Sequence, residues 1–181
     1  MISIVPLGLL AMSCATMTPL PGDEAARQRM LALLLPRRIE IVEPFTRVKS
    51  FDDDGTPDGI ELLLQAVNSL DDPGLMVIGT LRVELYEYVP ASGLPRGRRL
   101  EQWDVELVSD DQQRKYWNQL TQMYELRLGV DPKRIPSADR YVLLVTYDSP
   151  FGDRLTDEYM IQSRASTSEP RGGLSRKAAS N

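Results

Sequence analysis

The strongest constraint on the fold is a two-residue period of apolar side chains, which recurs along most of the chain after residue 37. Residues 77–89 show it most clearly, because Leu81, Val83 and Leu85 alternate with polar or amphipathic neighbours. A period of two places successive side chains on opposite faces of a β-strand, so that one face can be buried. The same pattern, interrupted by turn residues, occupies residues 38–41, 45–51, 60–67, 100–108, 124–130, 141–147 and 154–163.

These segments predict an all-β domain over residues 38–163. The strand spacing favours an immunoglobulin-like or transthyretin-like β-sandwich of about seven strands with one short helix. The chain has 181 residues, of which 42% are hydrophobic and 26% are charged. That length and composition are typical of one globular domain with a proper core.

Helix signals occur at two places. Ser109 and Gln112 form a capping-box pattern, which predicts a helix that runs to about Leu120. A second short helix can form over residues 23–35, with Asp23 as its N-cap residue, before Pro36 ends it.

Histidine is absent from the sequence, and the single cysteine, Cys14, lies near its beginning. These counts exclude Ser-His-Asp and Cys-His catalysis, His-ligated zinc and a disulfide within the chain. The net charge of −5 argues against general binding to a phosphate backbone. We therefore expect a non-enzymatic protein that binds no nucleic acid.

The N-terminal residues 1–13 (MISIVPLGLLAMS) form an apolar run that is typical of a signal peptide and too short to span a bilayer. Cys14 follows directly, and the stretch Ala11–Cys14 resembles a bacterial lipobox, in which the cysteine is acylated. A plain secretory signal or a buried N-terminal strand would also fit. The lipobox interpretation makes residues 14–37 a tether, and Ala15 resembles the outer-membrane sorting pattern. Residues 164–181 are predicted to form a disordered basic tail.

An acidic stretch, SFDDDGTPDGIE at residues 50–61, offers two interpretations. With Gly55 at the sixth position of a calcium loop, the ligands would be Asp52, Asp54, Thr56, Asp58 and Glu61. Ser50 would then stand where such a loop has aspartate, and residues 60–67 alternate like a strand rather than a helix. The stretch is therefore first predicted to be a turn between strands, in which Gly55 and Gly59 supply positive φ. Calcium is the one cofactor that the sequence leaves open.

A sugar-binding platform would need two or three exposed aromatic side chains, but most of them occupy inward-facing positions of the predicted strands and helix. We therefore predict that they pack mainly in the core, with hydroxyl groups at its rim. The set comprises Tyr86, Tyr88, Trp103, Tyr116, Trp117, Tyr124, Tyr141, Tyr147 and Tyr159.

The leader, Cys14 and the segments FDDDGTPDGIELLLQ, GTLRVELYEY, LEQWDVEL and YVLLVTYDSPFGDRLTDEY together resemble uncharacterised bacterial envelope lipoproteins of the kind frequent in planctomycetes. A second resemblance is to the transthyretin-like outer-membrane lipoprotein of the type VI secretion system. Both imply a membrane anchor at Cys14 and a location in the cell envelope, on the periplasmic face of the outer membrane. We expect a lipid-anchored β-sandwich that binds or supports an unknown envelope protein, with a calcium-dependent binding module as the alternative.

Overall fold

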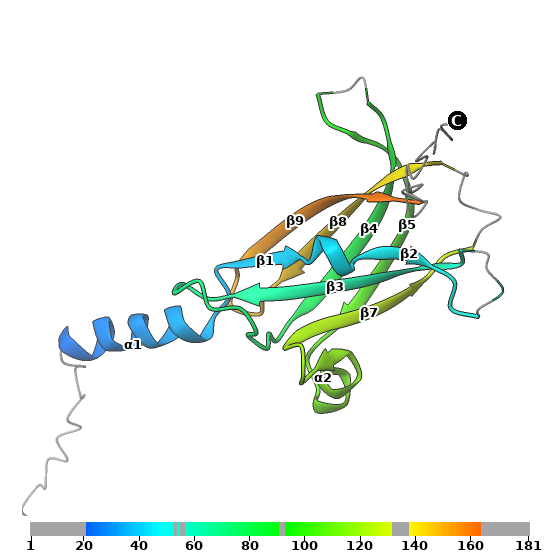
Figure 1. Ribbon diagram of the computed structural model, residues 1–181. Coiled ribbons are helices and arrows are strands. Elements are labelled where there is room, and N and C mark those ends of the chain that lie inside the picture. The colour runs from blue at the N-terminus through cyan, green and yellow to red at the C-terminus, as the bar shows by residue number, and fades with distance from the viewer. Residues whose placement is uncertain (1–20, 53, 55–56, 91–92, 132–137, 164–181) are drawn as a thin grey trace, which may run out of the picture.

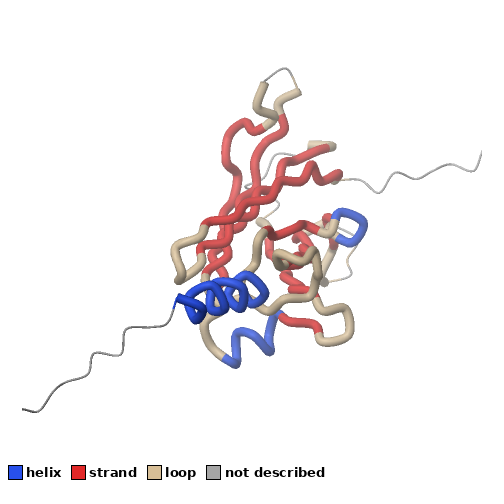
Figure 2. Tube along the Cα trace, turned by 90° about the vertical axis from the view of Figure 1, so that its left-hand side faces the viewer, coloured by secondary structure: helices blue, strands red, loops and turns tan. Residues whose placement is uncertain are grey.

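The computed structural model describes residues 21–52, 54, 57–90, 93–131 and 138–163. Two antiparallel sheets face each other and confirm the all-β sandwich (Figures 1 and 2). In spatial order, the first sheet contains β1 (Arg38–Ile41), β3 (Gly59–Val67), β7 (Met123–Gly129) and β6 (Trp117–Asn118), while β2 (Arg47–Lys49) pairs with β3. The second sheet contains β5 (Arg96–Glu106), β4 (Thr80–Tyr88), β8 (Arg140–Asp148) and β9 (Arg154–Gln162).

The core lies between the sheets and follows the alternation of the sequence. In β4 the side chains of Leu81, Val83 and Leu85 are buried, and their polar neighbours point away from the core. Each such apolar side chain contributes about 1.5–3 kcal/mol when it is removed from water. The opposing sheet supplies Ile60, Leu62, Leu64, Tyr124, Leu126 and Leu128.

Element boundaries differ from the sequence-based expectations at several places, and two of these have a clear local cause. The expected strand over residues 45–51 is shortened to β2, because Pro44 lies in a 3₁₀ helix, η1 (Glu43–Phe45). The helix that begins after Ser109, α2 (Asp110–Tyr116), ends before Leu120, because Trp117 pairs with Tyr124 as part of β6.

The N-terminal helix α1 (Pro21–Leu34) begins two residues before the expected N-cap, so that Asp23 lies in its first turn. It projects from the end of the sandwich at which β3 finishes (Figure 1). Its side chains over residues 23–34 are exposed, including those of Met30 and Leu34. Among the residues that the structure describes, no helix combines the length and the apolar character needed to cross a bilayer.

Candidate binding site

The acidic stretch at residues 50–61 forms the turn between β2 and β3, as the sequence predicts, with Lys49 opposite Gly59. Asp58 fastens the turn, because its Oδ1 accepts a hydrogen bond from the Phe51 backbone N–H at 2.8 Å. Asp52 accepts hydrogen bonds from the backbone N–H of Asp54 and from the Ser50 hydroxyl, and these bonds lower the pKa of its carboxyl. The carboxylates therefore cap backbone and hydroxyl donors within the turn.

Glu61 lies apart from that turn, on the outer face of β3. Its carboxylate pairs with Arg47 Nη2 at 3.0 Å and with Lys49 Nζ at 2.9 Å across the β2–β3 ladder. Burial by itself favours the protonated form of Glu61, but the hydrogen bonds from Lys49 and Arg47 outweigh it and lower the pKa. Of the predicted calcium ligands, Thr56 lies outside the described residues, and no cluster of three metal-ligating side chains occurs within them.

The expectation that Gly59 supplies a positive φ is wrong, because Gly59 is the first residue of β3 and has no such backbone angle. Its role is steric. The ring of Phe51 occupies the place where a side chain on residue 59 would begin, and the carbonyl oxygen of Leu128 lies 2.8 Å from that place. Gly55 lies outside the described residues, as do Cys14 and residues 164–181.

The aromatic residues divide into two groups. Tyr124, Tyr141 and Tyr147 are buried in the core, as predicted, whereas the other six are only partly buried. Among these six, Tyr116 is the last residue of α2 and Trp117 follows it, and the ring of Trp117 meets the Tyr124 ring edge-on at a centroid distance of 4.9 Å.

A buried hydrogen-bond network fixes α2 against the sandwich. The Tyr124 hydroxyl accepts a bond from the Val77 backbone N–H at 2.8 Å and donates to Gln113 Oε1 at 2.8 Å. Gln113 Nε2 in turn donates to the carbonyl oxygens of Val77 and Leu107, at 2.7 and 2.8 Å. Burial raises the pKa of the Tyr124 hydroxyl, although its hydrogen bonds act in the opposite direction. Every member of this network has a partner, so it orients the helix firmly.

A groove of about 640 Å³ lies where α2 and β6 meet the outer side of β7. It is lined by Glu61, Lys115, Tyr116, Trp117, Asn118, Gln119, Glu125, Leu126 and Arg127. A smaller hollow of about 280 Å³ shares Trp117 and Gln119 with it. In Figure 1, β7 is the outermost long strand of its sheet, and α2 lies beneath its N-terminal end.

The free edge of β7 forms one wall of this groove. The two residues of β6 pair only with Met123 and Tyr124, so that within the described residues the rest of β7 has no neighbouring strand on that side. Opposite residues in an antiparallel ladder alternate between hydrogen-bonded and non-hydrogen-bonded pairs. The Val130 N–H donates to the Asp58 carbonyl oxygen, which makes Leu126 and Leu128 the residues bonded to β3. The backbone groups of Glu125 and Arg127 therefore point away from β3, where the Glu125 N–H faces the Tyr116 carbonyl oxygen across the β6–β7 ladder and the Arg127 groups face the groove.

The carboxylates that line the groove have hydrogen-bond or ion-pair partners, whereas two of its cations have no carboxylate partner among the described residues. Glu61 is neutralised by Arg47 and Lys49, and Glu125 accepts a hydrogen bond from Asn118 Nδ2 at 2.7 Å. Arg127 lies over the Phe51 ring and Lys115 over the Tyr116 ring. Within the described part of the chain, neither of these two cations has a carboxylate at ion-pair distance. The groove therefore presents two cations without a counter-ion.

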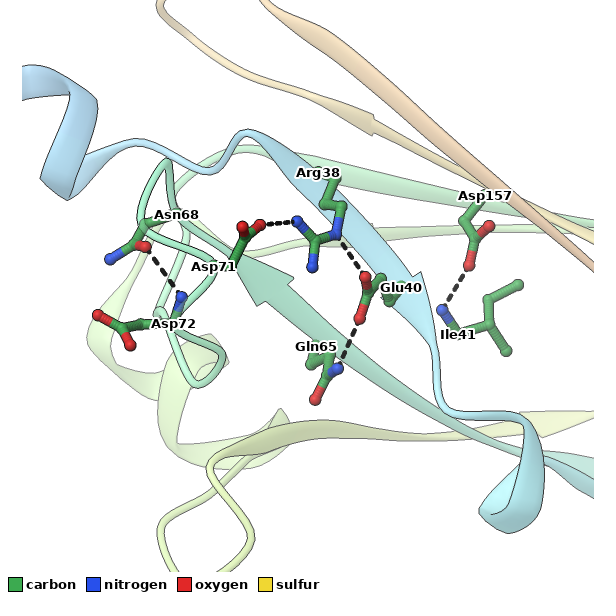
Figure 3. Close-up of polar contacts among 8 residues, drawn as sticks. All are labelled: Arg38, Glu40, Ile41, Gln65, Asn68, Asp71, Asp72 and Asp157. Carbon is green, nitrogen blue, oxygen red and sulfur yellow. Dashed lines mark hydrogen bonds and ion pairs between the residues drawn. The ribbon is translucent and has the colours of Figure 1, made fainter.

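On the opposite side of the sandwich, the edge strands β1 and β9 are joined to each other. There Asp157 of β9 accepts a hydrogen bond from the Ile41 N–H of β1 at 2.6 Å, which joins the edges of the two sheets (Figure 3). Nearby, Arg38 pairs with both Glu40 and Asp71, and Glu40 accepts a further bond from Gln65 (Figure 3). Edge strands that are covered in this way cannot accept another strand. The β7 edge has no such cover at Arg127 in the described structure.

Sequence reasoning missed this groove, because it assigned residues up to Leu120 to one helix. The run Arg114–Gln119 combines two cations, two aromatic residues and two amides, and it was the one available signal. Comparisons with protein-family models, with curated proteins and with solved structures found no match. The resemblance to envelope lipoproteins, and the choice between an immunoglobulin-like and a transthyretin-like sandwich, therefore stay predictions.

Proposed function

We propose that this protein is a non-enzymatic, lipid-anchored module of the bacterial cell envelope, which binds another envelope component through the β7 groove. The observation that carries this proposal is the free edge of β7 beside α2, with backbone groups and two cations directed at one groove. Covering such an edge with a partner removes the exposed backbone groups that sheet proteins otherwise protect.

The anchor is proposed from Cys14 and the lipobox-like residues before it. Multiple acyl chains on one cysteine would hold the protein firmly, because each buried methylene contributes about 0.8 kcal/mol. Helix α1 has 14 residues and would act as a spacer of about 21 Å, at 1.5 Å per residue, between that anchor and the sandwich. The position of Ala15 after the cysteine supports the periplasmic face of the outer membrane as the location.

The absence of histidine and the single cysteine support a binding role rather than an enzymatic one. The turn at residues 50–61 supports the calcium-dependent alternative less well. Glu61, which would complete the loop, is engaged by Arg47 and Lys49 instead.

The anchor is tested by replacing Cys14 with alanine in cells that express the full chain. The unaltered protein is expected to incorporate labelled palmitate and to leave the membrane fraction only in detergent. Cys14→Ala is expected to lose the label and to appear in the soluble fraction. Membrane association that is unchanged by this substitution would refute the anchor.

The binding role is tested by photo-crosslinking in the native envelope. A benzoylphenylalanine at Gln119, an exposed residue of the groove, is expected to give a discrete adduct. The matched control places the same probe at Thr156, which is exposed on β9 far from the groove. Equal adducts at both positions, or none at Gln119, would contradict a binding site in the groove.

A further inference from the structure

Building on the proposed function, we propose that the partner binds as an extended acidic peptide segment that adds a strand to β7, in line with β6. Such strand addition uses main-chain hydrogen bonds for affinity and alternate side chains for specificity. The proposal thereby specifies the chemistry of the partner and the atoms that recognise it.

The position for the added strand is created by the path of the chain. Strand β6 runs antiparallel to β7 but covers only Met123 and Tyr124, because the residues before Trp117 turn away into α2. A strand that continued the line of β6 would lie beside Glu125–Gly129. The capping box at Ser109 and the Tyr124–Gln113 bond hold α2 away from that line.

The backbone groups available to such a strand are identified by the ladder. The N–H and C=O groups of Arg127 and the C=O group of Glu125 face the open side, whereas the Trp117–Tyr124 pair of the β6–β7 ladder directs the Glu125 N–H at the Tyr116 carbonyl oxygen. The carbonyl oxygen of Gly129 already accepts a bond from Trp103 Nε1 at 3.1 Å, which sets the far end of the site. An added segment therefore gains main-chain bonds at two β7 residues.

The charge of the segment follows from the groove. Lys115 and Arg127 lack carboxylate partners in the part of the chain that the structure describes, and both line the groove. Carboxylates on alternate residues of an added strand would meet these cations on the outer face of the sheet. Residues 164–181 carry four Lys or Arg residues against one Glu, so the chain's own tail has the wrong charge.

A second copy of the protein does not fit as the occupant. If two β7 edges paired, each copy would bring its own Lys115 and Arg127 against the same two cations of the other copy. Like charges that face each other across an interface destabilise it. A separate acidic segment meets no such repulsion.

The test uses the full chain, produced with Cys14→Ala to prevent acylation, and a fluorescein-labelled peptide that alternates four glutamates with four valines. Fluorescence anisotropy is expected to show saturable binding that weakens as salt rises. The lysine–valine counterpart is expected not to bind. A glutamate–valine peptide with N-methyl groups on alternate amides keeps the charge but loses main-chain donors, and it is expected to bind about tenfold more weakly.

Protein variants separate the two parts of the proposal. Arg127→Glu is expected to weaken binding about tenfold, whereas Arg140→Glu, at an exposed position on β8, is the control and leaves it unchanged. Glu125→Ala is expected to bind as well as the unaltered chain or better. Arg127→Pro removes an edge-facing N–H and is expected to bind more weakly than Arg127→Ala, which lacks the same cation, once circular dichroism has confirmed its fold.

The outcomes distinguish this inference from the proposed function. If the N-methylated and unmodified peptides bind equally, or if Arg127→Pro folds and binds as Arg127→Ala does, strand addition is wrong. If the lysine–valine peptide binds as well, the charge assignment is wrong. The crosslink at Gln119 would survive either result, whereas its absence would count against the proposed function itself.

Discussion

Replacing Tyr124 with phenylalanine removes one hydroxyl from the centre of the network that holds α2. The ring itself is fully buried and stays in place, so the core loses no apolar volume. Removing the hydroxyl leaves two groups without their hydrogen-bond partner. These are the backbone N–H of Val77, which lies 2.8 Å from the hydroxyl oxygen, and Oε1 of Gln113, also at 2.8 Å. The change therefore tests hydrogen bonding and not packing.

The expected cost follows from what is left unpaired. A buried donor without an acceptor costs about 1–3 kcal/mol, so we expect Tyr124→Phe to lower the free energy of unfolding by about 2 kcal/mol. For a domain of this size the melting temperature would fall by roughly 6–10 °C. Tyr147→Phe is the matched control, since that hydroxyl donates to the Ile78 carbonyl oxygen at 2.6 Å and otherwise meets the Ser149 side chain, and about 1 kcal/mol is expected.

Urea denaturation of both variants measures these free energies. A local reporter is available, because the chain has two tryptophans and Trp117 packs against the Tyr124 ring. In a Trp103→Phe background, Tyr124→Phe is expected to shift the Trp117 emission to longer wavelength as α2 loosens. A loss below about 0.5 kcal/mol with unchanged emission would show that the network does not position α2, and the reasoning about the groove would fail with it.

Three further results are expected. Asp157→Ala should lower the free energy of unfolding by about 1–3 kcal/mol and promote aggregation through the uncovered β1 edge, whereas Asp153→Ala, at an exposed position, should do neither. Equal stability of the two variants would show that the Asp157–Ile41 bond does not hold the edges of the two sheets together. Millimolar calcium should leave the melting temperature unchanged, because Glu61 is already paired, and a rise that Asp52→Asn abolishes would restore the calcium interpretation. Burial raises the pKa of the hydroxyls of Tyr86, Tyr124, Tyr147 and Tyr159, so the folded state keeps protons that the unfolded chain loses as the pH rises. The free energy of unfolding should therefore be unaffected below about pH 10 and fall above it. Absorbance at 295 nm should show that these four tyrosines ionise at a higher pH than free tyrosine, and ionisation of all four at the ordinary pH would contradict this.

The parts of the fold that sequence could predict depend on local signals. The alternation through Leu81, Val83 and Leu85 is a local pattern, and it gave both the strand and its buried face. Ser109 and Gln112 likewise specify the start of α2, where both bonds of the capping box are present. Neither signal requires knowledge of which strands pair.

The parts that sequence could not predict depend on pairing between distant segments. The end of α2 is set by the pairing of Trp117 with Tyr124, which competes with continued helix. Glu61 looks like a calcium ligand in the sequence, and only the β2–β3 register brings Arg47 and Lys49 to its carboxylate. The groove at β7 exists because α2 leaves the sheet, and so it required the three-dimensional path of the chain.

Amide hydrogen exchange along β7, followed by NMR on the full chain, tests the central claim most directly. The amides of Leu126 and Leu128, which bond to β3, and of Glu125, which faces the Tyr116 carbonyl oxygen, should exchange slowly, while that of Arg127 at the free edge should exchange quickly. Addition of the glutamate–valine peptide should then slow exchange at Arg127 selectively. Uniform protection along β7 without the peptide would show that the edge is already covered and would contradict the proposed site.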